Sequence, residues 1–277
     1  MGQVDTRDGR GPVGRLKAIW RHRDTLWLLV RRDLKVRYAD SLLGYVWSVL
    51  DPLIMSLIYF FVFTYIFHRS VGGEPYIIFL LLALLPWLWF NTGTMEGMKA
   101  LKTQARLVRS TAVPREIWVL RSVIAKGIEF GLSIPVLVLF MVGFHSQMDV
   151  NGNVWLFPVA IVMQMMLISG AGLLLAPLMV LLKDIEPLVR LSMRFLFYAS
   201  PVIYGVHDVV SSVLPPAIQW LYMLNPMTGI LSAYRAGFFA TELDWLAILI
   251  AAFLSLGLLI VGWWVFARTE KTVLKEM

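Results

Sequence analysis

Long apolar runs separated by short polar stretches occupy most of this chain of 277 residues. A helix needs about 20 apolar residues to cross the roughly 30 Å hydrocarbon core of a bilayer. The pattern predicts six membrane spans, at about residues 45–67, 76–98, 117–144, 155–182, 188–204 and 245–266. The predicted fold class is therefore an all-α integral membrane protein, since helices satisfy their own backbone hydrogen bonds in lipid.

The polar residues before the first apolar run divide into two predicted elements. Residues 1–25 are basic, with glycine and proline near the start, and predict a loose cytoplasmic arm. Residues 26–42 predict an amphipathic helix, because apolar side chains recur on one stripe at helical spacing with basic residues beside it. The stripe consists of Trp27, Val30, Leu34 and Tyr38. Such a helix suits the headgroup region, where its long basic side chains reach the phosphates.

The apolar segment 205–244 lies between the last two predicted spans and is interrupted by three prolines. Proline removes a backbone donor and breaks a helix. The segment therefore divides into two pieces, at 214–224 and 226–240, that are too short to cross the membrane. We predict two short re-entrant helices that form an external gate segment covered by the protein. A hairpin resting on the lipid headgroups is the alternative.

The positively charged residues fix the predicted orientation. Of the 25 lysines and arginines, 21 fall in segments on one side of the predicted spans and 2 in segments on the other. The basic side comprises the N-terminal arm and helix, 99–116, 183–194 and the tail. Lysine and arginine are enriched in cytoplasmic loops, so both termini are expected in the cytoplasm of a protein of the bacterial inner (plasma) membrane. These loops account for the net charge of +7, and no nucleic acid partner is expected.

The residue content excludes several kinds of chemistry. The chain has no cysteine, so it forms no disulfide and no thiolate metal site. It has neither a glycine-rich nucleotide-binding loop nor a metal-ligand spacing, and we expect no catalytic residue, cofactor or metal. Its intramembrane charges lie toward the cytoplasmic side: Asp51 precedes Pro52, and Lys126 can pair with Glu129 on one helix face. This distribution disfavours coupling to protons or sodium.

Aromatic residues make up 13% of the chain. In the first predicted span Tyr59, Phe63 and Phe67 recur every four residues and form one face. Further rings near the external side are Tyr198, Tyr204, Trp220 and Tyr222. Rings lining a conduit and gate would suit a sugar chain, whose C–H faces pack on aromatic surfaces. Interfacial belts and helix packing explain the same spacing, so both interpretations stay open.

The basic segment 99–116 contains a helix-compatible stretch at 101–108, followed by Pro114. A short rigid helix between two spans can act as a lever for a soluble partner, because proline stiffens its exit. A solvated loop that only orients the protein is the alternative. The residues predicted to couple the lever to its partner are Arg106, Arg109, Ser110, Pro114 and Arg115.

Five motifs occur in order along the chain. They are residues 32–47 (RDLKVRYADSLLGYVW) with Asp51-Pro52, Val113-Pro114-Arg115-Glu116, Lys183-Asp184-Ile185, Ser200-Pro201-Val202-Ile203-Tyr204 and Leu224-Asn225-Pro226-Met227. Together they resemble the membrane permeases of ABC-type exporters of lipid-linked polysaccharides, which serve O-antigens, capsules, teichoic acids and galactans. Val113 stands where the family usually has phenylalanine, and Lys183 where it usually has arginine.

The resemblance implies a six-span permease that forms a homodimer and binds two copies of a cytoplasmic ATP-binding subunit, which holds ATP and Mg. It implies a polyprenyl-pyrophosphate-linked glycan as substrate, taken from the cytoplasmic leaflet. It also implies that residues 109–115 dock in the ATPase, with residues 183–187, among them Lys183 and Asp184, as a second contact. The residues expected to receive the lipid head are Arg31, Lys35, Arg37 and Tyr38. Arg31 and Lys35 are like charges one turn apart, whose repulsion an anionic partner relieves.

Two other classes of function compete with an exporter permease. A membrane-embedded enzyme of lipid-linked sugar metabolism would need clustered acidic residues at the interface, and the sequence has no such cluster. A channel or scaffold would need no ATP. Copurification with a soluble ATPase separates the exporter from both.

Overall fold

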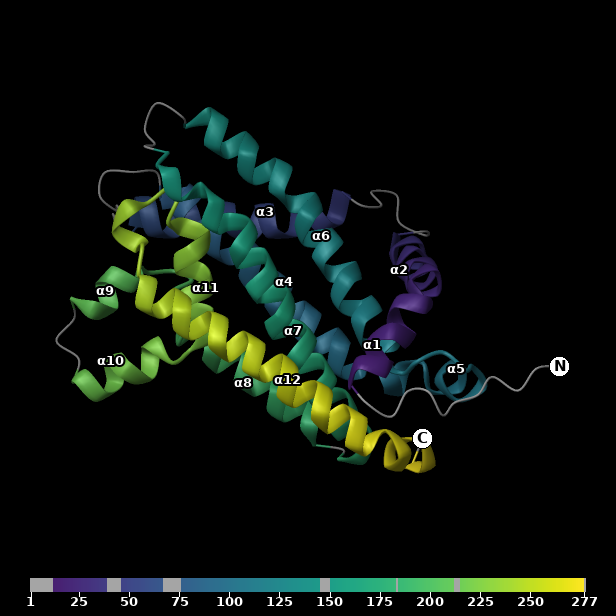
Figure 1. The fold of residues 1–277 in the computed structure, drawn as a ribbon. Helices are drawn as coiled ribbons and strands as arrows, with labels where there is room; N and C mark the ends of the chain where they lie inside the picture. The colour runs from purple at the N-terminus through teal and green to yellow at the C-terminus, as the bar shows by residue number, and fades with distance from the viewer. Residues whose placement is uncertain are drawn as a thin grey trace.

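The computed structural model describes residues 12–38, 46–66, 76–144, 150–182, 184–211 and 215–276, and its regular elements there are all helices (Figure 1). Four helical stretches are long and apolar enough to cross a membrane. They are α4 (Tyr76–Thr103), α6 (Glu116–Gly143), the 3-10 turn η3 (Gly152–Trp155) continued by α7 (Leu156–Leu181), and α12 (Trp245–Glu276). They match the second, third, fourth and sixth predicted spans, and the all-α fold class is confirmed.

The helices at the first and fifth predicted spans are shorter. α3 (Val46–Phe61) has 16 residues and continues as the π-helix η1 (Val62–Ile66), whereas α8 (Ile185–Tyr198) has 14 residues. At 1.5 Å per residue α8 measures about 21 Å, which is less than the hydrocarbon core. It ends early because Pro201 disfavours a helical conformation at the residue before it. By length, the described residues contain four candidate spans rather than the six predicted.

Close backbone contacts join the long helices. α7 packs against both α4 and α12, and α4 also packs against α6. A Cβ atom on Gly170 of α7 would lie 2.5 Å from the backbone nitrogen of Leu259 in α12, so only glycine fits there. Of the small residues in the spans, Gly97 of α4 lies against the backbone of α7, whereas a Cβ on Gly131 of α6 would meet no atom within 4 Å. Small residues therefore set the α4–α7–α12 packing.

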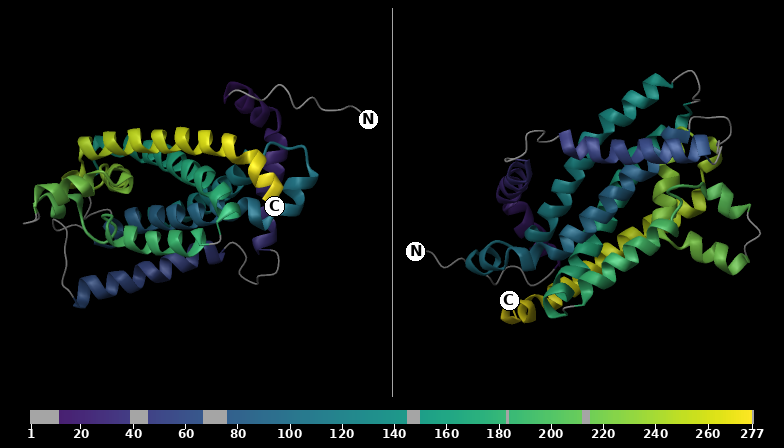
Figure 2. Two further views of the ribbon diagram at one scale, coloured as in Figure 1. Left: turned by 90° about the horizontal axis from the view of Figure 1, so that it is seen from below. Right: turned by 180° about the vertical axis from the view of Figure 1, so that it is seen from behind.

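The N-terminal segment is helical where a loose arm was expected. α1 (Pro12–Arg21) precedes α2 (Arg23–Tyr38), which begins three residues before the predicted amphipathic helix. Arg15 explains the order of α1, because its guanidinium binds the carboxylates of Glu116 and Glu270, far away in the sequence. The purple helices α1 and α2 run across the ends of the spans, roughly at right angles to them (Figure 2). This direction suits a helix in the plane of the membrane surface.

The helices of segment 205–244 gather at the end of the spans opposite α1, α2 and α5 (Ala105–Ser110) (Figure 1). They are α9 (Val206–Val210), α10 (Pro216–Met223), α11 (Pro226–Arg235) and the 3-10 turn η4 (Ala240–Glu242). α11 is buried from Met227 onward, whereas most of α10 is exposed. A hairpin lying wholly on the surface is therefore wrong for α11, which packs on α12, α7 and α4.

Candidate functional site

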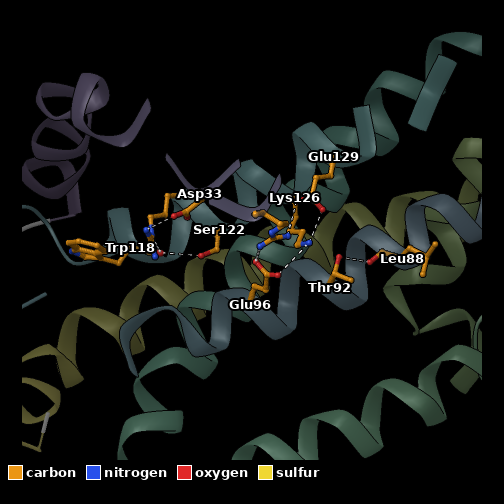
Figure 3. Close-up of polar contacts among 10 residues, drawn as sticks. Asp33, Leu88, Thr92, Glu96, Trp118, Ser122, Lys126 and Glu129 are labelled. Atoms are coloured by element: carbon orange, nitrogen blue, oxygen red, sulfur yellow. Dashed lines mark hydrogen bonds and ion pairs between the residues drawn. The ribbon is translucent and has the colours of Figure 1, made fainter. Parts of the chain in front are cut away.

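A cluster of four charged residues fastens α2 to the spans at the end where α5 lies. Arg37 of α2 donates to Glu96 of α4 at 2.6 Å and to Glu129 of α6 at 2.7 Å. Lys126 lies 2.7 Å from Glu129 and 3.4 Å from Glu96, which closes a ring of alternating charges (Figure 3). The predicted pair of Lys126 and Glu129 is thus confirmed, and Arg37 is held by carboxylates of the protein itself.

A second ion pair holds α2 one turn earlier. The guanidinium of Arg121 in α6 donates to Asp33 at 2.9 Å and lies 5.0 Å from the centre of the Trp118 ring (Figure 3). Burial raises the pKa of Asp33, and the charge of Arg121 opposes this shift. Between α2, α4 and α6 lies a cleft of about 330 Å³. Its lining includes Arg32, Asp33, Arg37, Glu96, Lys99 and Arg121.

The other residues expected to receive the lipid head face outward from α2. Arg31 is exposed and stacks 5.4 Å from the centre of the Trp27 ring, which steadies its guanidinium. Lys35 is exposed one turn further on. Tyr38 ends the helix, and its side chain lies outside the described residues. Arg31 and Lys35 thus form an outward basic pair, whereas Arg37 belongs to the ring of ion pairs.

The predicted lever is a helix held on one side by apolar packing. In α5 the side chain of Val108 is fully buried, whereas Arg106, Arg109 and Ser110 are exposed. Thr111 ends the helix by donating from both its backbone N–H and its hydroxyl to the carbonyl of Leu107. The buried side of α5 therefore fixes the helix on the protein, and its exposed side is basic.

The end of the same segment points inward. Pro114 is half-buried, and Arg115 forms an ion pair of 3.5 Å with Glu270 of α12. Glu116 is buried and binds Arg15. Of the residues expected to dock in the ATPase, the structure therefore places Arg106 and Arg109 outward and Arg115 in a contact with the C-terminal helix.

The expected second contact lies at the start of α8. Asp184 is exposed there, and Lys183 lies outside the described residues. Glu186 binds both Lys99 at the end of α4 and Arg190 one turn on in α8. The start of α8 is thus tied to the span that leads into the lever.

The aromatic residues predicted to form a conduit and gate separate into groups. Tyr59 is half-buried in α3, whereas the side chain of Phe63 and the whole of Phe67 lie outside the described residues. At the end of the spans where α9, α10 and α11 gather, the hydroxyl of Tyr204 donates to the carbonyl of Tyr198 at 2.6 Å, and its ring lies 6.1 Å from that of Tyr222. The rings of Tyr198 and Trp220 are largely exposed. The structure therefore brings Tyr198, Tyr204 and Tyr222 together.

Arg235 organises the end of the spans where α9, α10 and α11 gather. Its side chain is fully buried in α11 and donates to the carbonyls of Phe79, Pro201, Val202 and Tyr204 at 2.6 to 3.1 Å. Its guanidinium also lies 3.6 Å from the Glu242 carboxylate. The sequence held one clue to this residue, because Arg235 is the one lysine or arginine of segment 205–244.

The broken backbone between α8 and α9 is satisfied by side chains. Besides the three carbonyls that Arg235 binds there, Asn225 donates to the carbonyl of Ala199 and Tyr76 to that of Ile203. The hydroxyl of Tyr204 donates to the carbonyl of Tyr198. In total, six of the seven backbone carbonyls at 198–204 accept a hydrogen bond from a side chain. Within the hydrocarbon of a membrane, a non-helical backbone is tolerated only where protein covers it or where it lines a water-filled cavity.

Comparison with known proteins identifies the family of this arrangement. The profile of the ABC-2 type transporter family matches residues 24–239. The chain is 29% identical over 247 residues to the O-antigen export system permease protein RfbA of Klebsiella pneumoniae, covering 89% of this chain and 92% of that protein. It is 22% identical over 214 residues to the polysialic acid transport protein KpsM of Escherichia coli, covering 76% and 80%. The chain therefore belongs to the ABC-2 type transporter family and is the multi-pass membrane permease of an ABC transporter, not an enzyme, whose ATP-binding partner is a separate subunit.

Proposed function

We propose that this permease exports a polysaccharide linked to polyprenyl pyrophosphate from the cytoplasmic side of the bacterial inner membrane. The observation that carries the proposal is the similarity along nearly the whole chain to permeases named for O-antigen export. The active unit is a homodimer with two copies of a cytoplasmic subunit that binds ATP and Mg. Transport of a capsule, teichoic acid or galactan chain would use the same machinery.

Six spans with both termini in the cytoplasm give the proposed topology. α3 and η1 together contain 21 residues, enough for about 32 Å of helix. α8 completes a crossing with the covered backbone at 199–204, and α10 and α11 return from the external side without crossing. The basic helices α1, α2 and α5 lie at one end of the spans, which supports the cytoplasmic assignment of that end (Figure 1).

The outward basic pair on α2, Arg31 and Lys35, is the proposed receiver of the pyrophosphate. Both residues are exposed on a helix that runs across the span ends, whereas Arg37 keeps that helix on α4 and α6. The glycan then follows a path lined by the aromatic residues of α3 and of the external gate. Sugar rings have apolar C–H faces that pack on such side chains.

The test replaces Arg31 and Lys35 with glutamine. Each basic residue near an anionic surface contributes about 1 kcal/mol, so losing both should weaken capture of the lipid head about 30-fold. Glycan export in intact cells is measured by surface labelling, while membrane insertion and ATPase copurification should stay unchanged. Arg23→Gln, an exposed arginine two turns earlier on α2, is the matched control. Normal export by the double variant would leave α2 as a surface anchor only.

A further inference from the structure

Two arginines lie on the exposed surface of α8, which the proposed topology places in the membrane. α8 runs antiparallel to α4, in a register that two contacts set: Glu186 binds Lys99, and the ring of Phe197 lies 5.5 Å from that of Trp87. Trp87 is the middle residue of the apolar run of its span. Arg194 is three residues from Phe197 and therefore lies within about 5 Å of the middle of the membrane.

Arg194 is exposed at this depth, and in the part of the chain that the structure describes it forms no ion pair. Charged side chains within membrane spans are costly in lipid and face protein or a water-filled cavity instead. The end of the apolar run of α4 at Met98 lies about eight residues, or 12 Å, from the level of Arg194. This distance exceeds the length of an arginine side chain, so the side chain does not reach the headgroups. This side of α8 therefore faces water or protein rather than lipid.

Arg194 belongs to a stripe of exposed side chains along α8. Arg190, Arg194 and Tyr198 recur every four residues and so follow one another on the same side of the helix. The two arginines line a surface cleft of about 360 Å³. Glu186, also in this cleft, binds both Lys99 and Arg190. One carboxylate thus faces three cations, and the cleft keeps a net positive charge.

We propose that Arg190 and Arg194 form a phosphate-binding site within the membrane, which holds the pyrophosphate of the substrate between its capture on α2 and its passage to the external gate. This site rests on the proposed function and adds a step to its path. Guanidinium groups bind phosphate oxygens in a bidentate manner, and two of them one turn apart match the two phosphates of a diphosphate. A bound anion also relieves the repulsion between the two arginines. Tyr198, one turn further on, offers its ring to the adjoining sugar.

The first measurement asks whether water reaches this side of α8. Because the chain has no cysteine, a single introduced cysteine reports on its own surroundings. The permease and its ATP-binding subunit are placed in lipid nanodiscs, and the rate of labelling by a water-soluble methanethiosulfonate is measured. Leu191→Cys lies in the cleft and leaves both arginines in place. Phe253→Cys is the matched control, since Phe253 is exposed on α12 at about the same depth, in the register set by the glycine contacts of α7 with α4 and α12. Thiolates form in water, so Leu191→Cys should react at least about tenfold faster than the control.

The second measurement adds inorganic pyrophosphate to the same labelling reaction. Pyrophosphate should slow the labelling of Leu191→Cys, and this protection should disappear when Arg190→Gln/Arg194→Gln is added. Arg190→Lys/Arg194→Lys keeps the charges and should keep part of the protection. Equal protection with and without the arginines would mean that pyrophosphate acts elsewhere, and the proposed site would be wrong.

Export in intact cells separates this site from the proposed function. Arg190→Gln/Arg194→Gln should lower the glycan found by surface labelling, with unchanged membrane insertion and ATPase copurification, because both side chains are exposed. If wild type exports glycan but Leu191→Cys reacts no faster than Phe253→Cys, or pyrophosphate gives no protection, the inference is overturned and the proposed function stands. If wild type exports no glycan, the proposed function fails, and this inference fails with it.

Discussion

Replacing Arg235 with methionine should destabilise the end of the protein where α9, α10 and α11 lie more than any surface change. Methionine has a similar length but no donor, so four carbonyls lose their partner and the buried Glu242 loses its counter-charge. Each buried group left unsatisfied costs about 1–3 kcal/mol. Removing one partner of a buried ion pair costs about 3–5 kcal/mol. Because the segment at 199–205 can relax and recover part of this cost, we expect a loss of about 4 kcal/mol in the free energy of unfolding.

Unfolding by dodecyl sulfate in mixed micelles measures this loss. Arg194→Met is the matched control, since Arg194 is exposed on α8, and it should change stability by less than about 0.5 kcal/mol. Adding Glu242→Gln to Arg235→Met should restore about 2 kcal/mol, because the neutral amide oxygen still accepts from the Val206 N–H while the uncompensated charge is gone. Wild-type stability of Arg235→Met, or no recovery in the double variant, would refute the role assigned to this arginine.

Three further predictions follow from the contacts described. Arg109→Glu should lose the ATPase in copurification with unchanged stability, whereas Arg115→Glu should lower stability by repelling Glu270; equal behaviour of the two single variants would contradict the distinction. Gly170→Ala should cost about 1–3 kcal/mol by overpacking α7 on α12, and Gly131→Ala, which meets open space, should cost nothing. Because the chain has no cysteine, Ser211→Cys gives a single label site, which an impermeant maleimide should reach in intact cells; labelling only after permeabilisation would exclude the six-span topology.

The sequence predicted the elements that depend on local composition. The four long spans follow from apolar runs of about 20 residues, and the pair Lys126–Glu129 follows from a spacing of three within one helix. The helix α1 could not be predicted in this way, because Arg15 holds it through carboxylates 101 and 255 residues away. Such contacts exist only once the chain has folded.

In the candidate site, too, the sequence predicted what depends on local pattern and missed what depends on contacts between distant residues. The outward positions of Arg31, Lys35 and Arg109 agree with amphipathic patterns, which the sequence displays. Arg37 and Arg115 form ion pairs with carboxylates of α4, α6 and α12, so each basic residue that was expected to bind a partner binds carboxylates of the protein itself. Arg235 stood out only as the one lysine or arginine of segment 205–244, and its carbonyl partners on α4 and after α8 come from packing alone.

ATP-driven movement of a lipid-linked glycan in inverted membrane vesicles tests the central claim most directly. The vesicles contain this permease and its ATP-binding subunit, and a polyprenyl-pyrophosphate glycan added outside is measured by its protection from an added glycosidase. The account predicts protection that needs both proteins and hydrolysable ATP, and that falls in the Arg31→Gln/Lys35→Gln variant. Protection without ATP, or none with ATP and both subunits present, would contradict it.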